Sequence, residues 1–164
     1  APLALAAERG REPRLQPATH RSRLLVAQHW YRPRPPTACR RWGRNLETPS
    51  EDPAVCGQFG EAVTHGLQES PLDPRFVQAV VTLKHFDANS LEGDWGPNGT
   101  INRHTVDSQI SAHDLASTYL PAFKQAVEQG GALGVMCSYN AINGVPSCAN
   151  KWLLHDTLRR DWKF

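Results

Sequence analysis

Long hydrophobic runs are absent from this 164-residue sequence. No stretch approaches the roughly 20 consecutive apolar residues that a membrane-spanning helix needs, and the mean hydropathy is −0.50. We therefore expect no transmembrane segment. With 40% hydrophobic and 21% charged residues, the composition is that of an ordinary soluble core, and the length is that of one domain.

Several motifs that mark a defined chemistry are also missing. The four cysteines form no C-x-x-C pair and the seven histidines show no H-E-x-x-H spacing, so we expect no metal site. There is no G-x-S-x-G, P-loop or G-x-G-x-x-G motif, so nucleophile-elbow hydrolases and nucleotide-binding proteins have no support. No cofactor is expected.

Acidic residues are scarce at the start of the chain. Residues 1–41 contain nine arginines, no lysine and two acids, a net charge of +7, whereas residues 42–164 carry a net charge of −5. The first part also holds six prolines, which interrupt helices, and few apolar residues. We predict that residues 1–40 are a largely disordered Arg- and Pro-rich arm, distinct from a domain over 41–164.

The arm has three possible meanings. An Arg-rich tail can bind nucleic acid, but these arginines are scattered and few aromatic residues lie among them. A solvated linker is a second possibility. A mistranslated or unspliced stretch is the third, and the abrupt change of composition favours it. The short apolar Ala1–Ala7 opening resembles the end of a secretory signal.

Helical and extended patterns alternate after residue 41. Asp52-Pro53 predicts a helix start, and apolar residues every fourth position predict its buried stripe; these are Val55, Phe59, Val63 and Leu67. Residues 79–83 and 133–139 predict two buried strands. Residues 111–128 predict a helix that is capped by Ser111, interrupted at Pro121 and ended by Gly130-Gly131, and Asn150 predicts the cap of a last helix.

This order of helix, strand, helix, strand, helix predicts parallel β/α units. Periodicity alone does not separate an open doubly wound sheet from a (β/α)8 TIM barrel. A complete barrel takes about 250 residues, so a chain of this length would form only a portion of one. A partial barrel leaves strand edges and apolar faces without partners, and we expect the isolated piece to be marginally stable.

Polar residues gather where the predicted strands end. Lys84 and His85 close the first strand, Ser138-Tyr139-Asn140 closes the second, and Arg44 lies in the loop that enters the first helix. Sites in parallel β/α folds lie at the carboxyl ends of strands, although solvated residues at a strand end would look the same. Charged donors beside a phenol suit a neutral, polyhydroxylated ligand.

Adjacent residues of a regular strand point to opposite faces of the sheet. Lys84 and His85 can reach one ligand only if the chain bulges or a peptide bond turns cis, so we predict an irregularity at residues 84–86.

Two further features concern the oxidising, secretory compartment. Cys137 and Cys148 flank an Asn-Gly turn and could form a disulfide, although two free buried thiols would fit the spacing equally well. Asn98-Gly99-Thr100 is an acceptor sequence for N-glycosylation.

Several separate motifs resemble those of glycoside hydrolase family 3, and within it the β-xylosidases. The motifs are Arg41-Trp42-Gly43-Arg44-Asn45-Leu46-Glu47-Thr48-Pro49, Leu83-Lys84-His85-Phe86, Thr118-Tyr119-Leu120-Pro121 and Val135-Met136-Cys137-Ser138-Tyr139-Asn140. The resemblance implies an incomplete TIM barrel over residues 41–164. It also implies a secreted enzyme that removes terminal β-D-xylosyl or β-D-glucosyl residues from plant cell-wall oligosaccharides with retention of configuration.

The resemblance also implies roles for individual residues. Arg44, Lys84, His85 and Tyr139 would line the subsite for the terminal sugar, with Met136 nearby, and Arg103 would fill the space that a glucose hydroxymethyl needs. Retention requires two carboxyl groups about 5–5.5 Å apart. The nucleophilic Asp of the family follows a Trp-Gly-Phe-x-Gly segment and the acid/base comes from a later domain, so we assign no catalytic residue within these 164 positions.

Three functional interpretations follow. The chain is a portion of a glycosidase barrel that is inactive by itself, or a carbohydrate-binding pseudoenzyme that uses the same side chains. The third is an Arg-rich adaptor whose arm binds nucleic acid, with an affinity that collapses with salt. We favour the first, with a mono- or oligosaccharide as ligand and with neither nucleic acid nor membrane as a partner.

Overall fold

A computed structural model describes residues 25–26, 44 and 47–164 of the chain. Its elements in chain order are β1 (Leu25–Val26), α1 (Pro53–Gln68), β2 (Thr82–Phe86), η3 (Pro97–Gly99), β3 (Asp107–Ser108), α2 (Ala112–Asp114), η4 (Leu115–Tyr119), α3 (Pro121–Glu128), β4 (Gly134–Cys137), β5 (Ala141–Ile142), β6 (Val145–Pro146), η5 (Ser147–Ala149) and η6 (Trp152–Asp161). No helix in the described part is long and apolar enough to cross a membrane.

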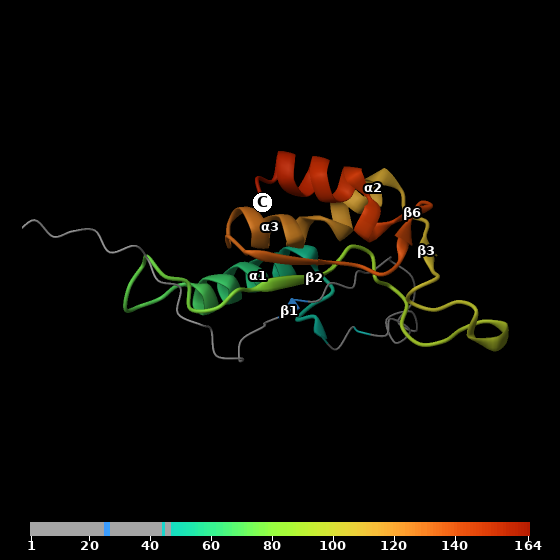
Figure 1. Ribbon diagram of the computed structural model, residues 1–164, viewed down its shortest axis with the longest axis horizontal. Helices are drawn as coiled ribbons and strands as arrows, with labels where there is room; N and C mark the ends of the chain where they lie inside the picture. Colours follow the sequence, from blue (N-terminus) through green and yellow to red (C-terminus); the bar gives the residue numbers. More distant parts are fainter. Residues whose placement is uncertain (1–24, 27–43, 45–46) are drawn as a thin grey trace, which may run out of the picture.

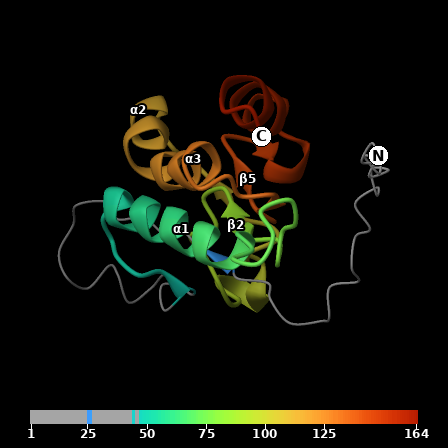
Figure 2. The same ribbon diagram turned by 90° about the vertical axis from the view of Figure 1, so that its left-hand side faces the viewer.

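The central sheet is parallel and has the order β1-β2-β4. Helices α3 and η6 lie on one side of it and α1 runs beside α3 (Figures 1 and 2). The predicted parallel β/α units are therefore confirmed. The first strand starts later and runs further than predicted, because Thr82 to Phe86 pair with β4, whereas the backbone N–H of Val81 donates to the side chain of Gln68 instead.

The two residues of β1 fall inside the predicted arm. They pair in parallel with Thr82 and Leu83 of β2, so this short segment is extended and bound to the sheet. The remainder of residues 1–40, with the Ala1–Ala7 segment, lies outside the described residues. Disorder or mistranslation of the arm therefore stays a prediction.

Helix α1 starts where the sequence predicts and buries a different face. The Asp52 carboxylate accepts a hydrogen bond from the backbone N–H of Ala54, as an N-cap does. The predicted stripe is wrong at its first two positions, because Val55 and Phe59 are 44% and 45% exposed. The buried face consists of Cys56, Gly57, Gly60, Thr64 and Gln68. Small side chains prevail there because α1 packs closely against α3.

The core lies between the sheet and the helices that cover it. The Phe86 ring stacks edge-on against Phe123 of α3 at 4.9 Å, and it contacts Trp162 at 5.7 Å between centroids. Leu83 and Leu153 are fully buried beside these rings. One cluster of aromatic and aliphatic side chains thus joins β2, α3 and the end of η6.

The helical segments after residue 110 follow the predicted boundaries. Ser111 Oγ accepts from the backbone N–H of Asp114, and Pro121 begins α3 after an i→i−5 hydrogen bond from Leu120 N to Leu115 O at 2.9 Å. Gly131 has a φ of 65° at the end of α3, so the predicted left-handed stop is confirmed. The Asn150 carboxamide accepts from Leu153 N and caps η6.

The close approach of α1 to the end of α3 predicts that a side chain at Gly130 would lower stability. A Cβ on Gly130 would lie 2.7 Å from the carbonyl oxygen of Ala126 and 3.1 Å from Cα of Glu61. Because neither backbone atom can yield cheaply, we expect Gly130→Ala to lower the free energy of unfolding by about 1–3 kcal/mol in chemical denaturation.

Gly66→Ala is the matched control. Gly66 lies inside α1 and has no atom within 4 Å of the position of an added Cβ. Its replacement should raise the free energy of unfolding by up to about 1 kcal/mol, because alanine favours helix. Equal effects of the two substitutions would contradict the proposed packing.

Candidate functional site

One carboxylate, that of Glu47, links the predicted cationic residues. Arg44 Nε donates to Glu47 Oε1 at 2.6 Å, and Lys84 Nζ lies 2.8 Å from Glu47 Oε2. Arg44 Nη2 forms a second ion pair with Oε1. The loop before α1 and the end of β2 are thus joined by a bridge of two cations across one anion.

Lys84 needs this counter-ion because it is only 4% exposed. A buried ammonium without an anion would lose its hydration and gain nothing in return. Burial opposes ionisation of Glu47, but the hydrogen bonds and charges of Lys84 and Arg44 outweigh it, so the pKa of Glu47 falls below its usual value. Glu47 therefore stays ionised.

The backbone of β2 is irregular at this point, as predicted. The Lys84–His85 and Phe86–Asp87 peptide bonds are cis, and the register with β4 shifts between Leu83 and Phe86. Lys84 contacts Glu47, and His85 Nε2 lies 3.4 Å from Arg44 Nη1. Two consecutive residues of the strand thus reach the same pair of side chains.

His85 is buried as a neutral imidazole. Burial lowers its pKa to about 4, assisted by the positive charges of Lys84 and Arg44. Its Nδ1 lies 3.3 Å from Nδ2 of Asn89, and its Nε2 lies 3.4 Å from Nη1 of Arg44. A guanidinium can only donate, so Nε2 accepts from Arg44 and the proton of the neutral ring lies on Nδ1. Nδ1–H can donate to Asn89 only if the amide presents Oδ1, which is buried without another partner, in place of Nδ2.

A second cluster lies beyond the end of β4. The Arg103 guanidinium is 5.4 Å from the centre of the Tyr139 ring, and the ring of His104 lies 4.7 Å from it. Glu92 anchors Arg103 through an ion pair of 2.8 Å. The long loop over residues 87–106 therefore folds back onto Tyr139, which stays 46% exposed.

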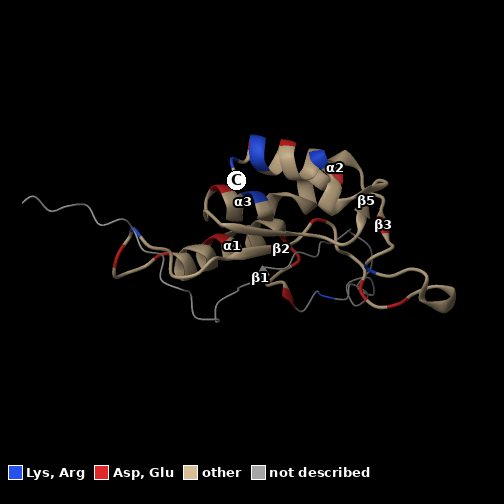
Figure 3. Cartoon of the chain, in the orientation of Figure 1, with Lys and Arg blue, Asp and Glu red and all other residues tan. Residues whose placement is uncertain are grey.

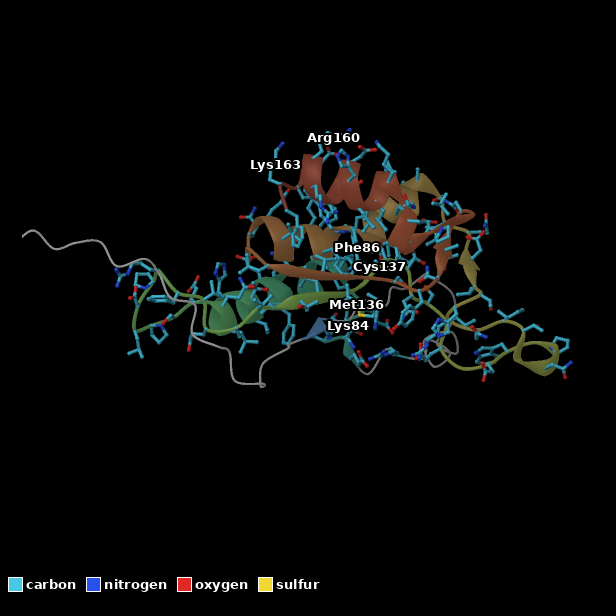
Figure 4. All side chains as sticks on the ribbon, viewed as in Figure 1. Lys84, Phe86, Met136, Cys137, Arg160 and Lys163 are labelled. Atoms are coloured by element: carbon cyan, nitrogen blue, oxygen red, sulfur yellow. A yellow bond between two sulfur atoms is a disulfide. The ribbon has the colours of Figure 1, made fainter. Side chains whose placement is uncertain are left out.

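The predicted site residues thus form two groups. Arg44 and Lys84 meet at Glu47 and His85 lies against Arg44, whereas Tyr139 packs against Arg103 and His104. The groups are electrostatically linked, because the charge of Arg103 contributes to the lowered pKa of His85. Figure 4 shows Met136 and Lys84 on the side of the strands opposite to Phe86.

A layer of buried polar residues supports the strand ends. Asn140 Nδ2 donates to the carbonyl oxygen of Asp87 at 3.2 Å, which ties the end of β4 to that of β2. Cys137 and Cys148 are joined in a disulfide with 5.2 Å between their Cα atoms. Burial raises the pKa of the Asp87 carboxyl well above its usual value.

The arrangement offers hydrogen-bond donors that are fixed in place. Lys84 has N–H groups beyond the one that faces Glu47, and Tyr139 presents a phenol and an apolar ring face. In the described part of the chain, no three His, Cys, Asp or Glu side chains are placed to hold a metal ion. These groups suit recognition of hydroxyls.

Sequence reasoning overlooked Glu47, Asn89, Glu92 and His104. Glu47 stands in the Arg44-Asn45-Leu46-Glu47 motif, and its spacing of three residues from Arg44 was the available signal. The other three lie in the long loop, where sequence gives no periodicity to show which residues turn inward.

Loss of the Glu47 charge should leave two cations unpaired. We expect Glu47→Gln to lower the free energy of unfolding by about 2 kcal/mol, somewhat less than the roughly 3–5 kcal/mol of a fully buried pair, because Glu47 keeps partial exposure. Denaturant titration measures this. Glu51→Gln is the control: Glu51 is exposed nearby, so its replacement should change stability by less than about 0.5 kcal/mol. Equal losses of unfolding free energy in the two variants would contradict a stabilising role of the bridge between Arg44, Glu47 and Lys84.

Known proteins share both the sequence and the fold of this chain. The Glycosyl hydrolase family 3 N terminal domain matches residues 37–164. Probable beta-D-xylosidase 7 of Arabidopsis thaliana is 44% identical over 129 residues, which cover 76% of this chain and 16% of that protein. Probable exo-1,4-beta-xylosidase bxlB of Aspergillus clavatus is 46% identical over 122 residues, which cover 74% and 15%.

Solved structures agree with this. The GH3 exo-beta-xylosidase XlnD, in complex with a xylobiose aziridine probe, has a TM-score of 0.67 and 38% identity over 75% of this chain and 15% of its own. Beta-glucosidase 3B of Thermotoga neapolitana, in complex with glucose, has a TM-score of 0.64 and 34% identity over 76% and 15%. The chain therefore spans about one sixth of the length of these relatives, and its parallel β/α units are those of a TIM-barrel-like fold. It belongs to glycosyl hydrolase family 3, as part of the N-terminal domain.

Proposed function

We propose that this chain supplies one wall of the terminal-sugar subsite of a retaining exo-glycosidase. The parent reaction is removal of terminal β-D-xylosyl, or β-D-glucosyl, residues from plant cell-wall oligosaccharides. The observation that carries the proposal is the cluster at the end of β2, in which Arg44 and Lys84 both pair with Glu47 and His85 lies against Arg44. The relatives named as xylosidases support the substrate class.

The charge state of the wall suits a neutral sugar. Glu47 compensates one of the two positive charges of Arg44 and Lys84, and His85 is uncharged above a pH of about 4 because its pKa is about 4. Hydroxyl groups of a sugar would accept from the remaining N–H groups of Lys84 and Arg44. Because the three side chains are already held, little conformational entropy is lost when the ligand binds.

Tyr139 and Arg103 form the second part of the proposed subsite. The exposed phenol would donate to a hydroxyl while its ring covers an apolar face of the sugar. Arg103, fixed by Glu92, would occupy the space that a hydroxymethyl group of glucose requires. Xylose lacks that group, so this arrangement favours xylose over glucose.

The catalytic pair does not come from these 164 residues. Family resemblance puts the nucleophilic carboxylate after a Trp-Gly-Phe-x-Gly segment and the acid/base in a further domain. Arg44, Lys84 and Tyr139 would orient the sugar ring, and two carboxyl groups about 5–5.5 Å apart would carry out the displacement. The same chain by itself would then bind sugar without hydrolysing it. We further propose that it works outside the cell, a location that the Cys137–Cys148 disulfide supports.

Isothermal titration of the purified chain with xylose and with glucose tests the proposal. We expect saturable binding of xylose, weaker binding of glucose, and no release of xylose from xylobiose. Tyr139→Ala should weaken binding of xylose at least tenfold, because it removes both the ring face and the phenol. Arg103→Ala should reduce the difference between the binding affinities for xylose and for glucose.

Arg75→Ala provides the control. Arg75 is an exposed arginine whose ion pair with Asp73 lies outside the two clusters, so its replacement should leave both affinities unchanged. A folded chain that gives no heat with either sugar would overturn the binding role. Hydrolysis of xylobiose by the chain would instead show that the catalytic groups are present.

A further inference from the structure

The loop after β2 carries a tight hairpin that takes no part in either site cluster. Trp95 and Ile101 exchange two backbone hydrogen bonds, of 2.7 and 2.9 Å, and enclose five residues between them. Asn98 and Gly99 at the tip have φ values of 57° and 67°, and Thr100 N donates to Pro97 O. An Asn-Gly pair with both φ positive is typical of a type I′ turn.

The hairpin stands away from the rest of the fold. Figure 1 shows the segment with η3 projecting beyond the sheet and the helices, and its five central residues carry no charge (Figure 3). Asn98 is exposed and, among the described residues, its carboxamide has no hydrogen-bond partner. A bulky group on this side chain would therefore displace nothing.

Asn98-Gly99-Thr100 is the single N-x-S/T sequence, with x other than proline, in the 164 residues. Asn98 lies at the tip of the turn and Thr100 ends it, and both residues are exposed. Loop tips with small polar residues are accessible to modifying enzymes. The sequence thus places its one acceptor at an open position.

Trp95 gives the base of the hairpin an apolar surface, three residues before Asn98. Its indole is 47% exposed, and Nε1–H donates to the carbonyl oxygen of Glu92 at 2.8 Å, which fixes the ring. Ile101, its partner across the hairpin, is 48% exposed. A sugar ring has an apolar face of C–H groups, and the face of an indole suits such a surface.

We propose that Asn98 is an N-glycosylation site whose first N-acetylglucosamine packs against Trp95. The ligand class is an N-linked oligosaccharide, donated by a polyprenyl diphosphate carrier. Asn98 Nδ2 forms the new bond to C1 of the sugar, while the bond from C1 to the diphosphate oxygen breaks. The diphosphate leaves with that electron pair, and Nδ2 gives up one proton. No oxidant or reductant is required.

Translation of the full chain behind a cleavable signal peptide, in the presence of endoplasmic reticulum microsomes, tests the modification. We expect a mobility shift that endoglycosidase H removes in the parent chain and in Thr100→Ser. Thr100→Ala should abolish the shift, because it deletes the hydroxyl of the acceptor sequence and leaves the left-handed Asn98 in place. Since the transfer acts on the entering chain, the readout does not require a folded product. A parent chain without the shift would overturn the proposal.

Packing on Trp95 has its own readout. In NMR spectra of the chain trimmed to one N-acetylglucosamine, the ring protons of that sugar should move upfield relative to the free glycoside, because the indole shields them. Trp95→Ala should abolish the upfield movement. Equal chemical shifts of the sugar ring protons in the parent chain and in Trp95→Ala would refute the packing on Trp95. Such a result would not affect the proposal that Asn98 is glycosylated. The proposed sugar subsite is measured on unmodified protein, so the two proposals can fail separately.

Discussion

A buried ammonium group sets the constraint on which the site depends. Lys84 is almost fully enclosed at the end of β2, and its charge is stable there only because Glu47 lies 2.8 Å away. Glu47 in turn comes from the loop before α1, so the need to pair Lys84 fixes that loop against the strand. Arg44, three residues earlier, is brought to His85 by the same carboxylate. One ion pair thus assembles side chains that are up to 41 residues apart in sequence.

The ends of β2 and β4 also separate the charged side chains of the site from the apolar core. Phe86 turns towards the helices and packs on Phe123, whereas Lys84 and Met136 lie on the other side of the strands (Figure 4). The Asn140 side chain, which donates to the backbone carbonyl of Asp87, connects the strands between these two environments. The long loop then places Arg103 and His104 over Tyr139. The sheet therefore carries a polar surface whose members come from the end of β2 and from the loops around it.

Short-range sequence preferences made part of the fold and of the site predictable. The Asp52 cap, the glycine stop after α3 and the parallel strands follow from short-range preferences and hydrophobic runs. The irregular backbone at Lys84 and His85 followed from the alternation of side chains along a strand. The buried face of α1 did not, because close contact with α3 selects small residues such as Gly57 and leaves Phe59 exposed. Glu47 was missed for a similar reason: its importance comes from Lys84, which is distant in sequence.

The state of His85 tests the convergence of these groups most directly. Its pKa of about 4 arises first from burial and then from the positive charges of Lys84 and Arg44, so it reports the enclosure of the ring beside these two cations. Because the folded state binds its proton less tightly than the unfolded state, His85 should lower stability as the pH falls from about 6.5 to about 4 and have no effect above that range. A ¹⁵N NMR titration of the imidazole should show a neutral ring, protonated at Nδ1, down to about pH 4. An imidazole that titrates near pH 6.5, its ordinary value, would contradict the account.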